Sequence, residues 1–210
     1  MTIITVSREF GSGGREFAKS LAEELQFTYY DKEIIRAVAE EMNLDPGYID
    51  SVMEHMPGIG LIPLNIGRSF AATALDAQTH YFDNDRVYGE QTKVIHELSQ
   101  RGPCVFVGRC SDYILRDRNV LRIFVYADMP AKVARCRERS AENENFTDRL
   151  LAKKIKDVDS NRMRYYQYFT DQKWGNPLNY DLCLNTSGKD IKTLAKTVAV
   201  LVKEREKLQG

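Results

Sequence analysis

Residues 5–18, TVSREFGSGGREFA, place the run Gly-Ser-Gly-Gly between a β-branched stretch and a helical pattern. Glycines let successive backbone N–H groups approach an anion closely, and the first turn of the following helix adds unpaired donors and a positive dipole. The spacing follows in part the phosphate-loop pattern G-x-x-x-x-G-K-[ST], with Gly13 as its second glycine. Gly14 then stands in the place of the lysine, Arg15 in the place of the serine or threonine, and Arg8 in the place of the first glycine.

This stretch has two interpretations. In the first it is a phosphate-binding loop, formed by Gly11, Ser12, Gly13, Gly14 and Arg15. Arg15 then replaces part of the charge of the missing lysine, and Arg8 is the second candidate for that role. In the second interpretation the stretch is a tight turn between a strand and a helix, and Arg15 points to solvent. The motif alone does not decide, because the missing lysine and hydroxyl are groups that contact phosphates and magnesium.

Further cations follow later in the chain. Arg109 comes directly after the apolar run CVFVG, and an arginine at the carboxyl end of a buried strand can face a ligand in an open α/β sheet. The segment 132–165 is rich in lysine and arginine, which is typical of a solvated charged helix. Its alternative role is that of a lid, whose arginines would stabilise the charge of a transferring phosphoryl group.

Short apolar runs and amphipathic helices must position these residues. The apolar runs predict buried strands over residues 3–6, 27–30, 104–107, 121–127 and 182–184. Helical patterns alternate with them over 15–25, 32–41, 86–100, 131–139, 150–169 and 191–207. This alternation predicts an α/β fold with a parallel sheet covered on both faces. Residues 43–85 carry three prolines and four glycines, and we expect short helices and loops there that either cover a substrate or form a surface excursion.

Composition narrows the class of protein. A chain of 210 residues fits one domain, and its 30 basic and 30 acidic residues argue against binding nucleic acid through a basic surface. We see no apolar run long enough for a membrane span and no secretion signal, and the four cysteines lack metal-binding spacing. We therefore expect a cytoplasmic protein that acts on a small molecule, without a nucleic-acid or membrane partner.

The ordered segments of the chain resemble the cytidylate kinase-like family, a branch of the P-loop nucleoside monophosphate kinases. The segments are ITVSREFGSGGREFAKSLAEEL, YYDKEIIRAVAE, VFVGR, IFVYA, KDVDSNRMRYYQYFT and NYDLCLNTS. The resemblance implies one P-loop kinase domain over residues 1–210, in three α/β/α layers around a five-stranded parallel sheet. It also implies a monophosphate-binding insertion over 32–100 and an arginine-rich lid over 132–165.

The same resemblance implies a reaction and its residues. The γ-phosphoryl group of ATP would pass to a nucleoside monophosphate, with CMP or dCMP favoured, in the presence of Mg²⁺. Residues 11–15 would hold the donor phosphates, and the acceptor would be bound by Asp31, Arg36, Arg109, Asp157 and Arg162. The groups acting on the transferring phosphoryl would be Arg15, Arg109, Arg135, Arg139 and Arg162. No residue is assigned as a direct magnesium ligand.

Three departures from the family pattern bear on these roles. The loop lysine is absent, Cys110 stands where a Gly-Arg-Asp motif would have its aspartate, and Asp157 and Asp159 are two apart where a D-x-x-D-x-x-R motif spaces them by three. Two functions therefore stay open from the sequence. One is a nucleoside monophosphate kinase, or a kinase for another small phosphorylated acceptor. The other is a nucleotide- or anion-binding module with little or no phosphoryl transfer.

Overall fold

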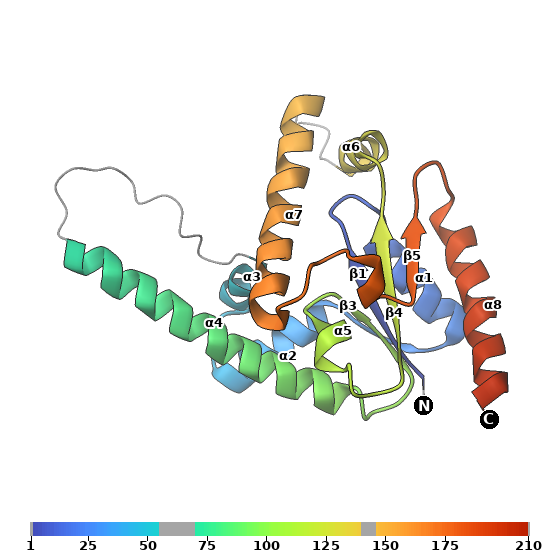
Figure 1. The fold of residues 1–210 in the computed structure, drawn as a ribbon, viewed down its shortest axis with the longest axis horizontal. Helices are drawn as coiled ribbons and strands as arrows, with labels where there is room; N and C mark the ends of the chain where they lie inside the picture. The colour runs from blue at the N-terminus through green and yellow to red at the C-terminus, as the bar shows by residue number, and fades with distance from the viewer. Residues whose placement is uncertain (1, 55–69, 140–145, 210) are drawn as a thin grey trace.

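A parallel β-sheet forms the centre of the protein. The computed structural model describes residues 2–54, 70–139 and 146–209 (Figure 1). Within these residues the strands are β1 (Ile3–Arg8), β2 (Thr28–Tyr30), β3 (Cys104–Val107), β4 (Val120–Tyr126) and β5 (Leu182–Asn185). They form one five-stranded sheet in the order β2-β3-β1-β4-β5, and every neighbouring pair is parallel. The carboxyl ends of all the strands therefore meet at one edge.

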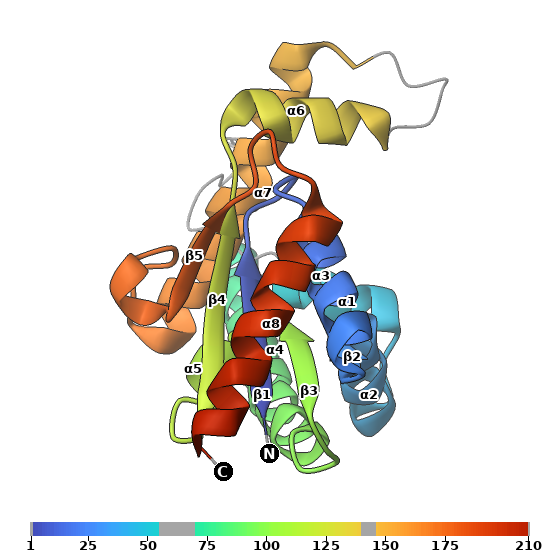
Figure 2. The same cartoon turned by 90° about the vertical axis from the view of Figure 1, so that its right-hand side faces the viewer.

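Helices cover both faces of this sheet. On one face α1 (Gly14–Leu25) and α8 (Ile191–Gln209) pack side by side (Figure 2). The apolar cluster on the other face draws on α2 (Lys32–Met42), α3 (Pro46–Glu54), α4 (Phe70–Leu98), α5 (Ser111–Ile114) and α7 (Asp148–Thr170). Alternate residues of β1 feed the two layers, since Ile4 and Val6 belong to the first cluster and Ile3 to the second.

Two helices border the carboxyl edge of the sheet. Helix α6 (Met129–Glu138) lies across the ends of the strands and contacts α7, which descends beside the sheet (Figures 1 and 2). A short 3₁₀ turn, η1 (Pro177–Asn179), leads from α7 back into β5. The loop after β1, the arginine after β3 and the charged helices are thus brought to one end of the molecule. Among the residues that the structure describes, no helix is both long and apolar enough to cross a membrane.

The predicted strands and the α/β class are confirmed, with strand ends shifted by at most two residues. One helix is longer than expected. The helix expected over 86–100 is the carboxyl-terminal part of α4, which already begins at Phe70, so the segment 43–85 is not only short helices and loops. Residues 70–98 contain no proline and a single glycine, and the alanines at 71, 72, 74 and 77 favour a helix. The short helix α3 agrees with the expectation, and residues 55–69 lie outside the described part of the chain.

Candidate active site

The loop between β1 and α1 is packed so tightly that two of its positions require glycine. Gly11 and Gly13 have φ angles of 73° and 79°, in the left-handed region. A Cβ at Gly11 would lie 3.0 Å from Sγ of Cys136, and one at Gly13 would lie 2.9 Å from Cδ1 of Ile191. The loop is therefore held between α6 on one side and the start of α8 on the other.

The backbone of this loop suits an anion. Gly13 is the N-cap residue of α1 and makes no side-chain cap, so the first turn of the helix offers its N–H groups at the loop. The carbonyl oxygen of Ser12 accepts hydrogen bonds from Oγ1 of Thr186 at 2.6 Å and Nη1 of Arg135 at 3.3 Å. Left-handed glycines before the first turn of a helix are the backbone pattern from which phosphate-binding nests are built.

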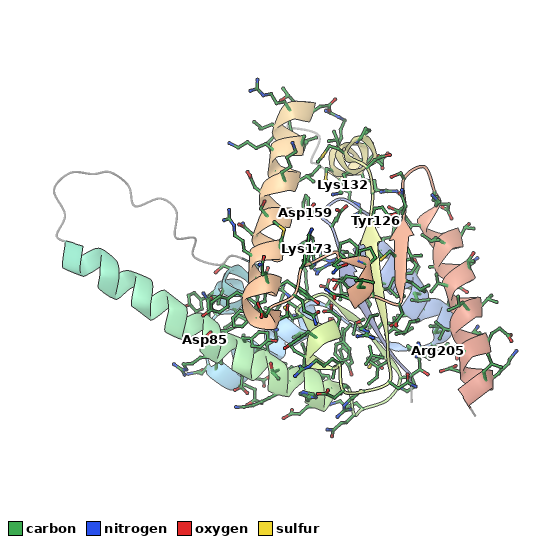
Figure 3. All side chains as sticks on the ribbon, viewed as in Figure 1. Asp85, Tyr126, Lys132, Asp159, Lys173 and Arg205 are labelled. Atoms are coloured by element: carbon green, nitrogen blue, oxygen red, sulfur yellow. The ribbon has the colours of Figure 1, made fainter. Side chains whose placement is uncertain are left out.

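A nearly buried lysine ties the loop to the helices above it. Nζ of Lys132 on α6 lies 2.6 Å from a carboxylate oxygen of Glu9 and 3.0 Å from one of Asp159 on α7 (Figure 3). The other oxygen of Asp159 accepts a hydrogen bond from the backbone N–H of Phe10 at 2.7 Å. Sequence reasoning placed Lys132 in the lid but missed this cluster, because its members lie far apart in the chain.

The missing lysine has a steric explanation. A Cβ built on Gly14 would lie 2.4 Å from Cβ of Arg8 and 3.2 Å from Cβ of Val125. Residue 14 therefore cannot carry a side chain while residue 8 is an arginine. Arg8 itself is only 8% exposed, and its guanidinium lies against Gly108, where an added Cβ would be 1.8 Å from Nη1. The glycines at 14 and 108 together make room for Arg8.

Three arginines from different elements line one pocket beside the loop. Arg8 ends β1, Arg109 follows β3, and Arg162 projects from α7. Nη1 of Arg162 donates a hydrogen bond to the carbonyl oxygen of Arg8 at 3.4 Å, and Nη2 of Arg109 contacts a carboxylate oxygen of Asp50 at 2.6 Å. The remaining lining residues are Ser7, Met53, Gly108, Cys110, Tyr165, Tyr166 and Trp174. Guanidinium groups gathered in this way match the oxygens of a phosphate group.

Four other predicted residues line an open groove beside α1 and not the arginine pocket: Arg15, Asp31, Arg36 and Arg139. Arg15 is half exposed, and its Nε lies 2.7 Å from a carboxylate oxygen of the buried Asp31 at the end of β2. Arg36 and Arg139 line the same open groove, and Arg139 forms an ion pair with Glu16 at 2.6 Å. The structure thus brings Arg109 and Arg162 together, and separately gathers the groove residues beside α1.

Arg135 and Asp157, the last two predicted residues, lie in different surroundings. Arg135 braces the loop, because Nη2 donates to the carbonyl oxygen of Thr186 at 2.5 Å while Nη1 reaches Ser12. Asp157 is exposed on α7 and lines neither the arginine pocket nor the groove.

A buried acid lies behind the arginine pocket. Cys110 stands where the family motif has an aspartate, but Asp112, two residues later, is 3% exposed and accepts a hydrogen bond from the hydroxyl of Tyr166 at 2.8 Å. Burial raises the pKa of the Asp112 carboxyl from 3.8 to about 6, and the Tyr166 hydrogen bond opposes that shift. Of the aromatic residues near this segment, Tyr165 and Tyr166 pack in the core and Trp174 is partly buried against it.

The sheet order, the glycine-rich loop after β1 and the helices above it are the features of a P-loop kinase fold. Solved structures share this fold: a shikimate kinase from Bacteroides thetaiotaomicron is 12% identical, with 96% of this chain and 98% of that one covered and a TM-score of 0.56. A gluconokinase from Sinorhizobium meliloti is also 12% identical, with 100% and 97% covered and a TM-score of 0.54.

A third structure, an uncharacterized protein from Eubacterium ventriosum, is 24% identical, with 97% of this chain and 99% of that one covered and a TM-score of 0.68. At these identities the similarity establishes the fold. Residues 3–188 match the cytidylate kinase-like family, and the chain belongs to that family. No curated protein matches the sequence.

Proposed function

We propose that this protein transfers the γ-phosphoryl group of ATP to a nucleoside monophosphate, with CMP or dCMP as the expected acceptor. The observation that carries the proposal is the pocket lined by Arg8, Arg109 and Arg162 beside the glycine-rich loop. An uncharged acceptor would not need guanidinium groups in its pocket, whereas a monophosphate offers oxygens to Arg109 and Arg162 and leaves Arg8 beside the loop. Membership in the cytidylate kinase-like family supports a pyrimidine nucleotide as that acceptor.

The loop residues fit the phosphates of ATP. The left-handed glycines at 11 and 13 and the first turn of α1 would form a backbone cradle, and such cradles hold nucleotide phosphates. Mg²⁺ bound with the nucleotide would neutralise charge that develops on the phosphate oxygens. Among the described residues no cluster of three or more His, Cys, Asp or Glu side chains is placed to hold a metal. Phosphate oxygens and water would therefore supply most of the magnesium ligands.

In the proposed reaction the chain contributes mainly positioning and positive charge. Arg109 and Arg162 would hold the acceptor phosphate, one oxygen of which forms the new bond to the γ-phosphorus while the bond between that phosphorus and the β–γ bridging oxygen breaks. The acceptor oxygen is already ionised near neutral pH, so no general base is needed. The arginines would also shield the repulsion between the two anions that must approach each other.

A nucleotide-binding module without turnover is the second candidate. It is favoured by Arg15, which stands beside the loop but is paired with Asp31 on the groove side. If no other group replaced the lysine, the backbone cradle would still bind a nucleotide, but the rate would fall by about a thousandfold or more.

An assay with purified protein separates the two candidates. The protein is incubated with ATP, Mg²⁺ and each of a panel of nucleoside monophosphates, and ADP formation is followed. The proposal predicts acceptor-dependent ADP, greatest with CMP or dCMP. Arg109→Ala should abolish it while the protein stays folded. The matched control is Arg137→Ala, since Arg137 is an exposed arginine of α6 that pairs with Asp148. ADP at background with every acceptor would overturn the kinase proposal.

A further inference from the structure

We infer that Arg8 performs the task of the loop lysine, holding the γ-phosphate of the donor from the opposite side of the loop. The inference rests on the proposed function, because it assigns the cation that the donor site would otherwise lack. The glycine and the cation of the phosphate-loop pattern have exchanged places at residues 8 and 14. The arginine stands where the phosphate-loop pattern has its first glycine, and a glycine stands where the pattern has its lysine.

The steric relationship between the two positions supports the exchange. A side chain leaving residue 14 would start toward Arg8, because the added Cβ falls 2.4 Å from Cβ and 3.1 Å from Cγ of that residue. The stem of Arg8 therefore occupies the path that a lysine at position 14 would take. Gly14 has no left-handed φ, so its backbone would accept another residue. The contact with Arg8, and a lesser one with Val125 at 3.2 Å, excludes a side chain there.

The far end of Arg8 lies in the pocket proposed for the acceptor. Its guanidinium rests on Gly108, at the turn after β3, and lines the same pocket as Arg109 and Arg162. The side chain thus spans from the first residue of α1 to the proposed acceptor pocket. A lysine in the usual position reaches the β- and γ-phosphates as a point charge, whereas a guanidinium can bind two oxygens at once.

Three other cations beside the loop do not line the arginine pocket. Arg15 pairs with Asp31, and Arg135 donates to backbone carbonyl oxygens of Ser12 and Thr186. Lys132 contacts two carboxylates, so that cluster carries an excess of negative charge. Arg8 is nearly buried and lines the pocket together with Arg109 and Arg162.

The test measures binding of two nucleotides that differ at the γ-phosphate. Dissociation constants for Mg²⁺ complexes of ADP and of the non-hydrolysable ATP analogue adenylyl imidodiphosphate are determined by calorimetry. The variants are Arg8→Gln, Arg8→Gly and the double variant Arg8→Gly/Gly14→Lys, which restores the pattern G-x-x-x-x-G-K. Circular dichroism melting checks that each is folded, and Arg137→Gln is the matched control.

Loss of the Arg8 guanidinium should weaken the analogue about tenfold or more relative to ADP, the effect of one charge-assisted hydrogen bond. The double variant should recover most of this discrimination. The single variant Gly14→Lys should be less stable than the wild type, because Arg8 still fills the space.

The inference is overturned if Arg8→Gln and Arg8→Gly keep the discrimination of the wild type, or lose affinity for both nucleotides equally. It is also overturned if Arg15→Gln alone removes the discrimination, or if the double variant is no better than Arg8→Gly. A wild-type protein that shows Arg8-dependent discrimination but phosphorylates no acceptor would contradict the proposed function alone. A wild type that binds neither nucleotide would overturn both.

Discussion

A carboxylate oxygen of Asp50 on α3 lies 2.6 Å from Nη2 of Arg109, so the arginine that follows β3 is paired with an acid from a helix. The two side chains differ in solvent exposure: that of Arg109 is 4% exposed and that of Asp50 is 50% exposed. Arg109 is buried in the pocket wall, whereas Asp50 lies at the surface. An acceptor phosphate would therefore compete with Asp50 for the same guanidinium.

Replacing Asp50 with asparagine should strengthen acceptor binding. Asp50→Asn removes the competing charge, and we expect the KM for the acceptor to fall by about threefold to fivefold with kcat little changed, a size typical of a partly exposed ion pair. Steady-state kinetics with varied acceptor would measure this. Glu40→Gln on α2 removes the same charge from an exposed position and should leave KM unchanged. An unchanged or higher KM in Asp50→Asn would contradict the competition.

Lys132 should be important for folding stability. Lys132→Met would leave the carboxylates of Glu9 and Asp159 facing each other without their shared cation, at a cost of about 3 kcal/mol. Urea unfolding would measure the loss. Lys19→Met removes an exposed lysine that lies 3.9 Å from Glu23, and it should cost less than about 0.5 kcal/mol. Equal stabilities for the two variants would show that the cluster does not hold the loop against α6 and α7.

Arg135 should influence donor binding through the loop. Its guanidinium joins the carbonyl oxygens of Ser12 and Thr186, so Arg135→Ala weakens the link between the loop and the turn after β5, where the hydrogen bond from Oγ1 of Thr186 to Ser12 then remains. The KM for ATP should rise by about tenfold, in keeping with the loss of charge-assisted hydrogen bonds. The comparison variant is Arg137→Ala, from the exposed side of the same helix. If both variants bind ATP like the wild type, the brace has no role in the donor site.

Asp112 should make stability depend on pH in a specific direction. Its pKa in the folded protein, about 6, lies above the ordinary 3.8, so the folded state binds more protons than the unfolded state between these values. The stabilising contribution of this group is present below pH 4 and is lost as the pH rises through 6. Asp112→Asn removes this dependence, so its stability relative to the wild type should rise by up to about 3 kcal/mol between pH 4 and pH 7.

Unfolding curves of both proteins at several pH values would test this. The difference between the two free energies of unfolding isolates the contribution of Asp112, since the other titrating groups are shared. A difference that stayed constant from pH 4 to pH 7 would mean that Asp112 titrates normally.

The sequence predicts the sheet well because its central strands β1 and β3 are buried throughout, and apolar runs such as CVFV in β3 mark them. It also predicts that Arg109 lies at the carboxyl edge, since that follows from its place after β3. The start of α4 was missed because an alanine-rich stretch carries little periodicity. The coupling of Arg8 to Gly14, the pairing of Arg15 with Asp31 and the cluster around Lys132 could not be predicted, because each depends on distances between segments that only the folded chain brings together.

Transfer of label from ATP tests the central claim most directly. The wild-type protein is incubated with ATP labelled at the γ-phosphate, Mg²⁺ and CMP, and the products are separated by chromatography. If the arginine pocket presents a monophosphate to the γ-phosphoryl group, the label appears in CDP, and Arg109→Ala abolishes this while Arg137→Ala does not. Label that stays in ATP or appears only in inorganic phosphate, with CMP and with the other nucleoside monophosphates alike, would contradict it.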